Sequence, residues 1–244
     1  MDPAPYLTVL FPAYNEEKRI AAAIKETAQY FKDTRFTVEI LIVENGTTDK
    51  TEQIAAAAAL EYLPAANNII YTYRKSNKGK GAAVRHGLNC ARGKFILITD
   101  VDLSTPLNQL PKLFRSRLDY PIVIGSRKKK GSKVIGLDMR RRLSSLVYSL
   151  MAWPLTPGIL DTQCGFKLIH NLAAKDLTEF ITIDGFSYDV ELLHAAQQRG
   201  YKIKEVPVIW IHNENSKINL FRDSVGMARE LLSIYGQSKK GRYN

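Results

Sequence analysis

The chain has 244 residues, of which 45% are hydrophobic, and this is enough to bury a large core. Lys and Arg outnumber Asp and Glu by 35 to 24, and the net charge of +11 favours an anionic partner: a nucleic acid, a phosphorylated small molecule or an acidic lipid surface. The first residues do not form a signal-peptide pattern, and Cys90 and Cys164 have no metal-type spacing, so we expect a cytoplasmic protein.

Short apolar runs alternate with helical patterns through the first half of the chain. The runs predict strands at Tyr6–Phe11, Val38–Val43, Ile69–Tyr73, Phe95–Thr99 and Ile122–Gly125. The helical patterns between them lie at Glu16–Phe31, Lys50–Tyr62, Gly81–Ala91 and Leu107–Arg117. This alternation is typical of an α/β fold with a mainly parallel, Rossmann-like sheet flanked by helices.

The second half is less regular. We expect a helix at Met139–Trp153, a strand within residues 163–169, a helix near Asp189–Arg199, a strand at Val206–Ile211 and an amphipathic helix at Leu220–Tyr235. Between Arg142 and Asp161 the sequence has no charged residue. Pro154, Pro157 and Gly158 interrupt this stretch, so it predicts a segment that dips into a membrane surface or is covered by a partner, and not a membrane span.

Polar motifs follow three of the predicted strands. They are PAYNEE at residues 12–17, ENGTTD at 44–49 and DVDLSTP at 100–106. Because ligands bind beyond the carboxyl ends of the strands in such sheets, we expect a site here. Asp100 and Asp102 offer two carboxylates, which suit Mg²⁺ or Mn²⁺ completed by water and substrate phosphates. One of them could instead cap the next helix, but Ser104 and Thr105 already supply that cap.

These motifs resemble those of family 2 glycosyltransferases. Pro12, Tyr14, Asn15 and Glu16 resemble the family's opening motif, and the likeness continues through VENGTTDKT, NKGKGAAVRHG and DVDLSTP in the same order. GSRKKKG, DTQCGFKLI, YDVELL and HNENSK resemble the subgroup containing dolichyl-phosphate glucosyltransferases and dolichol-phosphate mannose synthases, with DTQCGFKL closest to the glucosyl members. The resemblance covers roughly residues 7–217.

This resemblance implies a GT-A fold, a nucleotide diphosphate-sugar donor and a divalent metal, Mg²⁺ or Mn²⁺, held by Asp100 and Asp102. The residues that it assigns to the donor site are Pro12, Tyr14, Glu16, Glu44, Asn45, Lys80, Asp100, Val101, His212 and Lys217. The Tyr14 ring would offer an apolar face to the nucleoside, with core packing as the alternative. Lys80 lies near a helix N-terminus, where anions are favoured.

Glu44 and Asn45 stand where the family usually has paired aspartates. The N3–H of uracil would therefore meet an amide oxygen, which can accept that bond. Because an amide can also donate a hydrogen bond, nucleotides with bases other than uracil remain alternatives.

Displacing a nucleoside diphosphate builds negative charge on the leaving oxygens, which cations such as Lys217 or His212 can stabilise. A lipid phosphate is already anionic near pH 7 and needs no strong base. The catalytic candidates are Asp102, Asp189 and Arg127, with Asp189 orienting the acceptor or the sugar. A structural role is the alternative for His212 and Asp189.

A basic run precedes the uncharged segment. Eight cations lie from Arg127 to Arg142 and are opposed only by Asp138, and a solvated loop is the simplest alternative explanation. Three of these cations open the predicted helix at Met139 and oppose its macrodipole, so a bound anion would explain their placement. The resembling mannose synthases use an Arg and a Ser one turn apart for the lipid phosphate. Here these are Arg141 and Ser145, with Arg127 as a second clamp.

We therefore expect one catalytic domain spanning residues 1–244. Residues 1–125 would bind the nucleotide sugar, and residues 126–244 would bind the acceptor and carry membrane-surface helices. The predicted reaction is inverting transfer of a sugar, glucose from UDP-glucose by preference, to a polyprenyl or dolichyl phosphate at the cytoplasmic face of a membrane. The alternatives are a family 2 enzyme that acts on a glycan hydroxyl and a non-enzymatic nucleic-acid binder. We expect no nucleic-acid partner, because a binder leaves the Asp pair unexplained.

Overall fold

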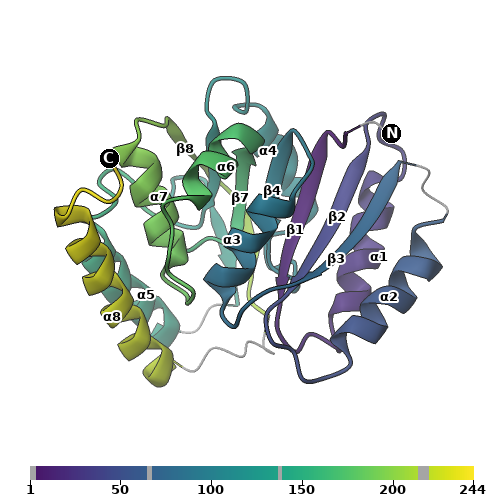
Figure 1. The fold of residues 1–244 in the computed structure, drawn as a ribbon, viewed down its shortest axis with the longest axis horizontal. Helices are drawn as coiled ribbons and strands as arrows, with labels where there is room; N and C mark the ends of the chain where they lie inside the picture. The colour runs from purple at the N-terminus through teal and green to yellow at the C-terminus, as the bar shows by residue number, and fades with distance from the viewer. Residues whose placement is uncertain (1–3, 65–67, 137–138, 214–219) are drawn as a thin grey trace.

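The computed structural model describes residues 4–64, 68–136, 139–213 and 220–244 (Figure 1). Its centre is a seven-stranded sheet in the order β3-β2-β1-β4-β7-β5-β8. The strands are β1 (Leu7–Ala13), β2 (Val38–Glu44), β3 (Ile69–Lys75), β4 (Phe95–Thr99), β5 (Ile122–Ser126), β7 (Phe166–His170) and β8 (Ile203–Pro207). Neighbours are parallel except that β7 runs antiparallel to β4 and β5. The predicted α/β fold with a mainly parallel sheet is confirmed.

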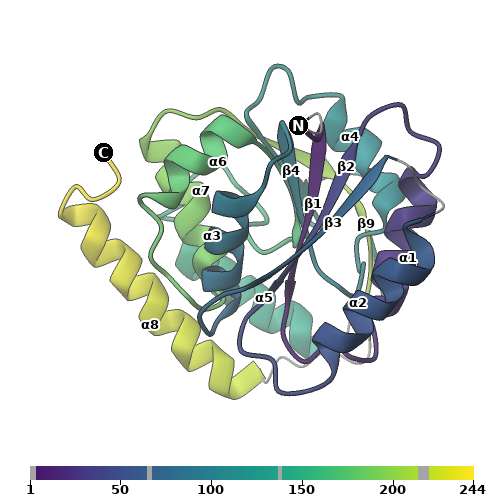
Figure 2. The ribbon, with the colours of Figure 1, turned by 45° about the vertical axis from the view of Figure 1, so that its right-hand side comes forward.

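Helices cover both faces of this sheet (Figure 2). One face is covered by α1 (Ile20–Phe31), α2 (Thr51–Tyr62) and the short pair η1 (Leu107–Gln109) and α4 (Leu110–Phe114). The other face is covered by α3 (Lys80–Cys90), α5 (Met139–Ala152), α6 (Asn171–Thr178), α7 (Tyr188–Gln198) and α8 (Leu220–Lys239). In β1, Val9 and Phe11 enter the first core and Leu10 enters the second. Strand alternation therefore produces two apolar cores, one on each face.

Several elements differ from the prediction. The expected strand at Val206–Ile211 is two strands, because the chain leaves the main sheet at Val208 and forms β9 (Ile209–Ile211) beside β6 (Lys133–Ile135). Because the apolar pattern continues from β8 into β9, the sequence predicted a single strand. Helix α6 was not predicted, and α1 begins at Ile20, four residues later than expected.

Helices α5 and α8 pack together at the end of the molecule away from α1 and α2 (Figure 1). The face of α5 that carries Tyr148 and Ala152 is buried. None of the helices in the described ranges is long and apolar enough to cross a membrane.

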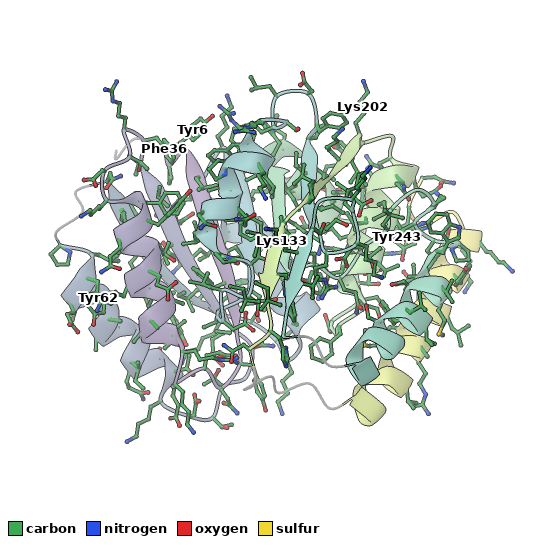
Figure 3. All side chains as sticks on the ribbon, turned by 180° about the vertical axis from the view of Figure 1, so that it is seen from behind. Tyr6, Phe36, Tyr62, Lys133, Lys202 and Tyr243 are labelled. Atoms are coloured by element: carbon green, nitrogen blue, oxygen red, sulfur yellow. The ribbon has the colours of Figure 1, made fainter. Side chains whose placement is uncertain are left out.

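The amino-terminal and carboxyl-terminal ends of the strands form two edges of the sheet, and these edges carry different kinds of side chain. At the amino-terminal edge, Tyr6 and Phe36 lie together (Figure 3), with ring centroids 5.1 Å apart, and Phe95 and Phe114 complete the aromatic cluster. At the carboxyl-terminal edge, polar loops follow β1, β2 and β4. The fold therefore gathers the sequence motifs at one edge.

Candidate active site

The loops after β1 and β2 are tied to each other. The Asn45 N–H donates to the Ala13 carbonyl at 3.1 Å, and the Thr48 N–H donates to Asn15 Oδ1 at 2.8 Å. Asn15 has a positive φ of 54°, a conformation that Asn tolerates better than most residues. The first two motifs therefore form one surface, as their places after neighbouring parallel strands predict.

Three predicted nucleoside-site residues have different surroundings. Tyr14 is 48% exposed, which removes core packing as its role. Pro12 is half-buried in β1. Glu16 accepts two hydrogen bonds of 2.7 Å from the Arg19 guanidinium. Tyr14 thus lies at the surface, and the Glu16 carboxylate is engaged with Arg19.

Glu44 and Asn45 are both buried, but the Glu44 carboxylate accepts hydrogen bonds and the Asn45 amide oxygen accepts none from the described residues. Glu44 Oε1 accepts from the N–H groups of Gly46 and Thr47 at 2.7 and 2.5 Å, so this carboxylate organises its own turn. Asn45 is 7% exposed, and its Oδ1 lacks a hydrogen-bond partner among the described residues. A buried acceptor without a donor is costly, and a ligand N–H would relieve that cost.

Asp100 and Asp102 follow β4, as predicted. Asp100 Oδ1 lies 2.6 Å from the Lys80 ammonium, and its Oδ2 packs so closely on Gly165 that a Cβ there would lie 2.2 Å away. Asp102 Oδ1 accepts from the Ser104 N–H at 2.9 Å, and its Oδ2 lies 3.9 Å from the Arg19 guanidinium. The cap that Ser104 and Thr105 were expected to supply is absent: η1, the first helix after them, has no side-chain cap hydrogen bond.

The carboxylate oxygens of Asp100 and Asp102 suit a hard divalent cation. The described residues contain no group of three or more His, Cys, Asp or Glu side chains that could hold a metal ion. The protein contribution would therefore be the two carboxylates of Asp100 and Asp102, on either side of the buried Val101. Mg²⁺ and Mn²⁺ sites with few protein ligands are completed by water and substrate phosphates, so the residues present fit such an ion.

Lys80 begins α3 and points its ammonium at the carboxylates. Burial lowers the pKa of Lys80, but the negative charges of Asp100, Asp189 and Asp102 outweigh burial and leave it above its usual value. The helix N-terminus itself is occupied, because the Asp184 carbonyl accepts from the Gly81 and Ala82 N–H groups at 2.8 and 3.3 Å. These two N–H groups therefore cannot bind an anion as they stand. A cation at this helix end is supplied by the Lys80 side chain.

Asp189 lies in the first turn of α7 and pairs with a residue that sequence reasoning missed. Its Oδ1 is 2.5 Å from the ammonium of Lys167, which projects from β7. Burial raises the pKa of Asp189, and the charges of Lys167 and Lys80 oppose the rise. The signal for Lys167 was a lysine inside the apolar run FKLI. Glu191 instead accepts from the Thr182 and Ile183 N–H groups, so the two carboxylates face different ways.

Arg127 follows β5 and His212 follows β9, and both lie against Trp210. The Arg127 guanidinium donates two 2.8 Å hydrogen bonds to the buried Asp161, whose pKa falls to about 2 because Arg127 outweighs the effect of burial. Trp210 stacks on His212 with ring centroids 5.7 Å apart, and Arg127 lies over the Trp210 ring at 5.6 Å. Arg127 is thus engaged on one edge of its guanidinium, and its role as a phosphate clamp stays a prediction.

The predicted acceptor helix presents apolar side chains outward. Leu146, Val147, Leu150 and Met151 on α5 are all exposed, and Leu150 is 67% exposed. Ser145 on the same helix is half-buried, and its carbonyl accepts from the Ser149 hydroxyl at 2.7 Å. The Arg141 side chain and all of Lys217 lie outside the described residues, so their roles also stay predictions.

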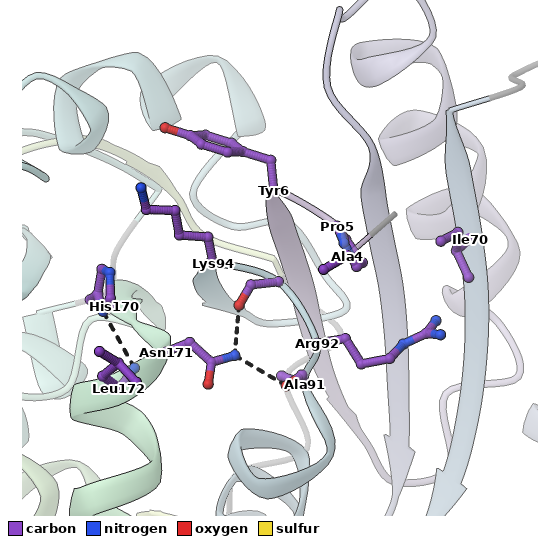
Figure 4. Close-up of a pocket in the computed structure, with 11 residues that line it drawn as sticks. Ala4, Pro5, Tyr6, Ile70, Ala91, Arg92, Lys94, His170, Asn171 and Leu172 are labelled. Atoms are coloured by element: carbon purple, nitrogen blue, oxygen red, sulfur yellow. Dashed lines mark hydrogen bonds between the residues drawn. The ribbon is translucent and has the colours of Figure 1, made fainter. Parts of the chain in front are cut away.

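A separate hollow of about 780 Å³ lies at the opposite, amino-terminal edge of the sheet (Figure 4). Its wall includes Arg92, Lys94, His170 and Asn171, and the Asn171 amide donates to the Ala91 and Gly93 carbonyls there. None of the predicted site residues lines this hollow. The chemistry-bearing motifs and the hollow therefore occupy opposite edges.

Comparison with known proteins identifies relatives. Residues 8–178 match the model of glycosyl transferase family 2. A dolichyl-phosphate beta-glucosyltransferase of Trichomonas vaginalis is 35% identical over 95% of this chain and 73% of its own, and a mouse protein of the same name is 35% identical over 95% and 75%. The Dictyostelium discoideum protein of that name is 33% identical over 94% and 73%.

Solved structures show the same architecture. Glucosyl-3-phosphoglycerate synthase of Mycobacterium tuberculosis, solved with Mn²⁺, uridine diphosphate and glucosyl-3-phosphoglycerate, aligns with a TM-score of 0.69 at 21% identity over 97% of this chain and 80% of that one. A form with Mg²⁺ and uridine diphosphate aligns with a TM-score of 0.67. This likeness shows that the fold is the GT-A fold that the sequence predicted.

Proposed function

The chain belongs to glycosyl transferase family 2, and from this premise we propose that it transfers glucose from UDP-glucose to a dolichyl or polyprenyl phosphate, with inversion at the anomeric carbon. The curated relatives that carry this activity in their names align with nearly the whole chain. The observation that carries the proposal from the structure is that α5 turns an apolar face outward while its inward face packs in the same core as α7, which carries Asp189. Burial raises the pKa of Tyr148 on that inward face, and the Asp189 carboxylate raises it further.

The donor side supports a uridine nucleotide. The partnerless Asn45 Oδ1 can accept the N3–H of uracil, and the exposed Tyr14 ring can pack on the nucleoside. Lys80, already beside the carboxylate pair, is placed to meet the negative charge of a diphosphate. Uridine diphosphate is the nucleotide in the structural relatives named above.

The reaction follows from the charges at the carboxyl-terminal edge. Asp100 and Asp102 would hold Mg²⁺ or Mn²⁺, which supplies positive charge to the departing diphosphate. Lys80 adds a further cation on the same side. The acceptor phosphate is already ionised near pH 7, so it attacks the anomeric carbon in a single displacement without deprotonation by the protein.

The acceptor side supports a lipid. A polyprenyl phosphate must keep its tail in the bilayer while its phosphate reaches the donor, so cations and apolar surface have to adjoin. Lys128, which follows Arg127, donates to the Ser149 hydroxyl on α5, and Lys129 and Lys130 are exposed nearby in sequence. We infer that α5 and this basic loop hold the protein peripherally at the cytoplasmic face of a membrane, with Arg141, Ser145 and Arg127 at the phosphate.

The test is product formation from a panel of donors. The purified protein is incubated with radiolabelled UDP-glucose, UDP-N-acetylglucosamine or GDP-mannose, polyprenyl phosphate and Mg²⁺, and the lipid is extracted into organic solvent. We expect label in the organic phase from UDP-glucose, and none after chelation of the metal. Label that appears only in water-soluble glycans would favour the hydroxyl-acceptor alternative. Label from GDP-mannose alone would replace glucose with mannose.

A further inference from the structure

We propose that the amino-terminal edge of the sheet is a docking surface for an acidic peptide segment with apolar side chains, supplied by a partner protein. The surface is a groove of two neighbouring hollows, of about 780 and 230 Å³, which share His170 and Leu172 as wall residues. Figure 4 shows the larger hollow. It lies at the opposite edge of the sheet from Asp100 and Asp102, so the inference goes beyond the proposed function and does not depend on it.

Three nitrogen-bearing side chains surround the Phe95 ring, which is buried at the start of β4. The Lys94 ammonium and the Arg117 guanidinium each lie 5.9 Å from the centroid of this ring, and the centroid of the His170 ring lies 5.2 Å from it. Phe95 and His170 are partners in the antiparallel pairing of β4 with β7, and Arg117 lies in the turn after α4. The topology therefore gathers side chains from three segments at one point.

The two cations of this cluster have no acidic partner among the described residues. The Arg117 guanidinium donates to the Tyr6 hydroxyl at 3.1 Å and to the Phe114 carbonyl at 2.6 Å, and both acceptors are uncharged. The salt bridges of the described residues include neither Lys94 nor Arg117, although the exposed Asp119 follows closely in sequence. The positive charge is therefore uncompensated, and it attracts the carboxylates of a partner.

The rest of the groove wall adds hydrogen-bond donors. His170 Nδ1 accepts from the Leu172 N–H at 3.3 Å, which leaves the proton of the neutral ring on Nε2. Burial lowers the pKa of His170 and the charge of Lys94 lowers it further, so this ring is an uncharged donor near pH 7. On the other side of the larger hollow (Figure 4), the Arg92 guanidinium is held by the buried Glu39 carboxylate at 2.9 Å. Carboxylate oxygens can accept hydrogen bonds from each of these groups.

Two exposed leucines lie beside these donors. Leu172 is 75% exposed and lines both hollows. Leu118 is 77% exposed and lines the smaller one together with Pro121 and Tyr201. Large apolar side chains that stay exposed beside a hollow are typical of an interaction site. The groove therefore combines apolar contact with positive charge, and its complement is a segment in which acidic and leucine-like side chains occur together.

The shape and charge of the groove favour a peptide over three other occupants. A second copy of this chain would bring the same cations face to face in a twofold contact, and like charges repel. A bilayer surface fits a protruding apolar face better than a hollow. A small metabolite is normally enclosed on most sides, whereas Arg92, Lys94 and Leu172, which line this groove, are exposed.

The first test measures peptide binding to the purified full chain by fluorescence anisotropy. The probe is a fluorescein-labelled peptide of Glu, Leu and Gly, and two comparison peptides replace either Leu with Ser or Glu with Lys. We expect the Glu and Leu peptide to bind, the Ser peptide to bind roughly tenfold more weakly because apolar burial is lost, and the Lys peptide not to bind. Equal binding of the Leu and Ser peptides, or no binding of either, would overturn the proposal.

The second test uses matched variants to locate the peptide. Lys94→Glu reverses an exposed cation of the groove, and Lys129→Glu makes the same change in the loop after β5. Lys94→Glu should weaken binding roughly tenfold at low salt and less at high salt, and Lys129→Glu should change it by less than about threefold. Leu172→Ser should weaken binding roughly tenfold at either salt concentration, because its contribution is apolar. Its control is Leu232→Ser, at a position on α8 that is 69% exposed.

All four substituted side chains are exposed, so the variants should keep the fold, which circular dichroism checks. Loss of peptide binding in Lys129→Glu but not in Lys94→Glu would place the peptide on the basic loop and overturn the proposal. A dimer in sedimentation velocity that Leu172→Ser dissociates would assign the groove to a second copy instead. Weaker co-flotation of Lys94→Glu and Leu172→Ser with anionic liposomes, without peptide binding to the unaltered protein, would assign it to a membrane and would equally overturn the proposal.

Discussion

The proposed donor edge and the proposed acceptor side of this molecule are built in opposite ways. At the donor edge, polar groups are engaged with one another: Asn15 with Thr48, Glu44 with its own turn, and Lys80 with Asp100. On the acceptor side, α5 exposes leucines that a water-soluble surface would normally bury. A preorganised polar site fits a small ligand that must be held in one geometry, and an exposed apolar face fits a fluid partner. Substitutions in the two regions should therefore have different effects: those in the first region should reduce nucleotide binding and turnover, and those in the second should reduce acceptor or membrane binding.

The largest effect is expected at the carboxylate pair. Asp102→Ala should lower turnover by at least about 10³-fold, because the protein loses one of two ligands for a cation that neutralises the leaving diphosphate. The melting temperature should change little, since Asp102 contributes no side chain to either core. Turnover is measured by lipid extraction and binding of UDP by calorimetry. The exposed Asp119 provides the matched control Asp119→Ala, and equal activity in the two variants would remove the pair from the mechanism.

The second prediction tests whether Arg127 belongs to the acceptor site alone. Arg127→Ala should lower the free energy of unfolding by about 3–5 kcal/mol, because it removes the guanidinium that pairs with the buried Asp161 carboxylate. Denaturant unfolding at pH 7 measures this loss. The Arg127 and Asp161 pair stabilises the fold above the usual pKa of Asp, and this contribution disappears as the pH falls through the folded pKa of about 2. A fully stable variant with weak acceptor use would make Arg127 a pure phosphate clamp.

Arg141→Ala should separate acceptor binding from donor binding. Loss of a charged hydrogen bond to a phosphate costs about 1.5–3 kcal/mol, so the KM for polyprenyl phosphate should rise roughly 10- to 100-fold. The KM for UDP-glucose should stay within about twofold. Arg115→Ala, at an exposed position after α4, is the control for loss of one positive charge. If the variant loses donor binding instead, the lipid-phosphate assignment fails.

The sequence predicted local features of these regions better than pairings across the sheet. The carboxylates after β4 and the loops after β1 and β2 could be placed, because each follows directly from the strand before it. The pair of Lys167 with Asp189 could not, since it depends on β7 entering the sheet antiparallel between β4 and β5. The same holds for Arg127 and Asp161, which meet across 34 residues of sequence.

The sequence predicted the helix α5, but it did not show what covers the apolar face of this helix. The spacing of its leucines predicts an apolar face, and in a compact fold such a face usually turns inward. Here Tyr148 and Ala152 supply the inward contacts, and Leu146 and Leu150 point out. Periodicity identifies a face without saying what covers it.

The outward face of α5 should govern membrane binding. Leu150→Ser should weaken co-flotation with anionic liposomes by roughly tenfold, because burying one leucine contributes about 1.5–3 kcal/mol. Leu118→Ser is the matched control: Leu118 is 77% exposed but lies at the amino-terminal edge, in a small hollow that it lines together with Pro121 and His170. Replacing Lys128, Lys129 and Lys130 with Gln should reduce flotation further at low salt and have little effect at high salt. Equal flotation of the two leucine variants would contradict the assigned membrane face.

The smallest expected effect concerns the base. UDP should bind more tightly than GDP, because the buried Asn45 Oδ1 lacks a donor among the described residues and can accept the uracil N3–H. Asn45→Asp should strengthen UDP binding by about two- to tenfold, since a charged acceptor makes the stronger hydrogen bond. Asn45→Leu should weaken it by a similar factor, because the ligand N–H is then left without a partner. Calorimetry with UDP and GDP on all three proteins separates these outcomes, and GDP binding serves as the internal control. Should GDP bind more tightly to the unaltered protein, Asn45 would be acting as a donor to a different base, and the sugar assigned to this enzyme would shift from glucose to mannose.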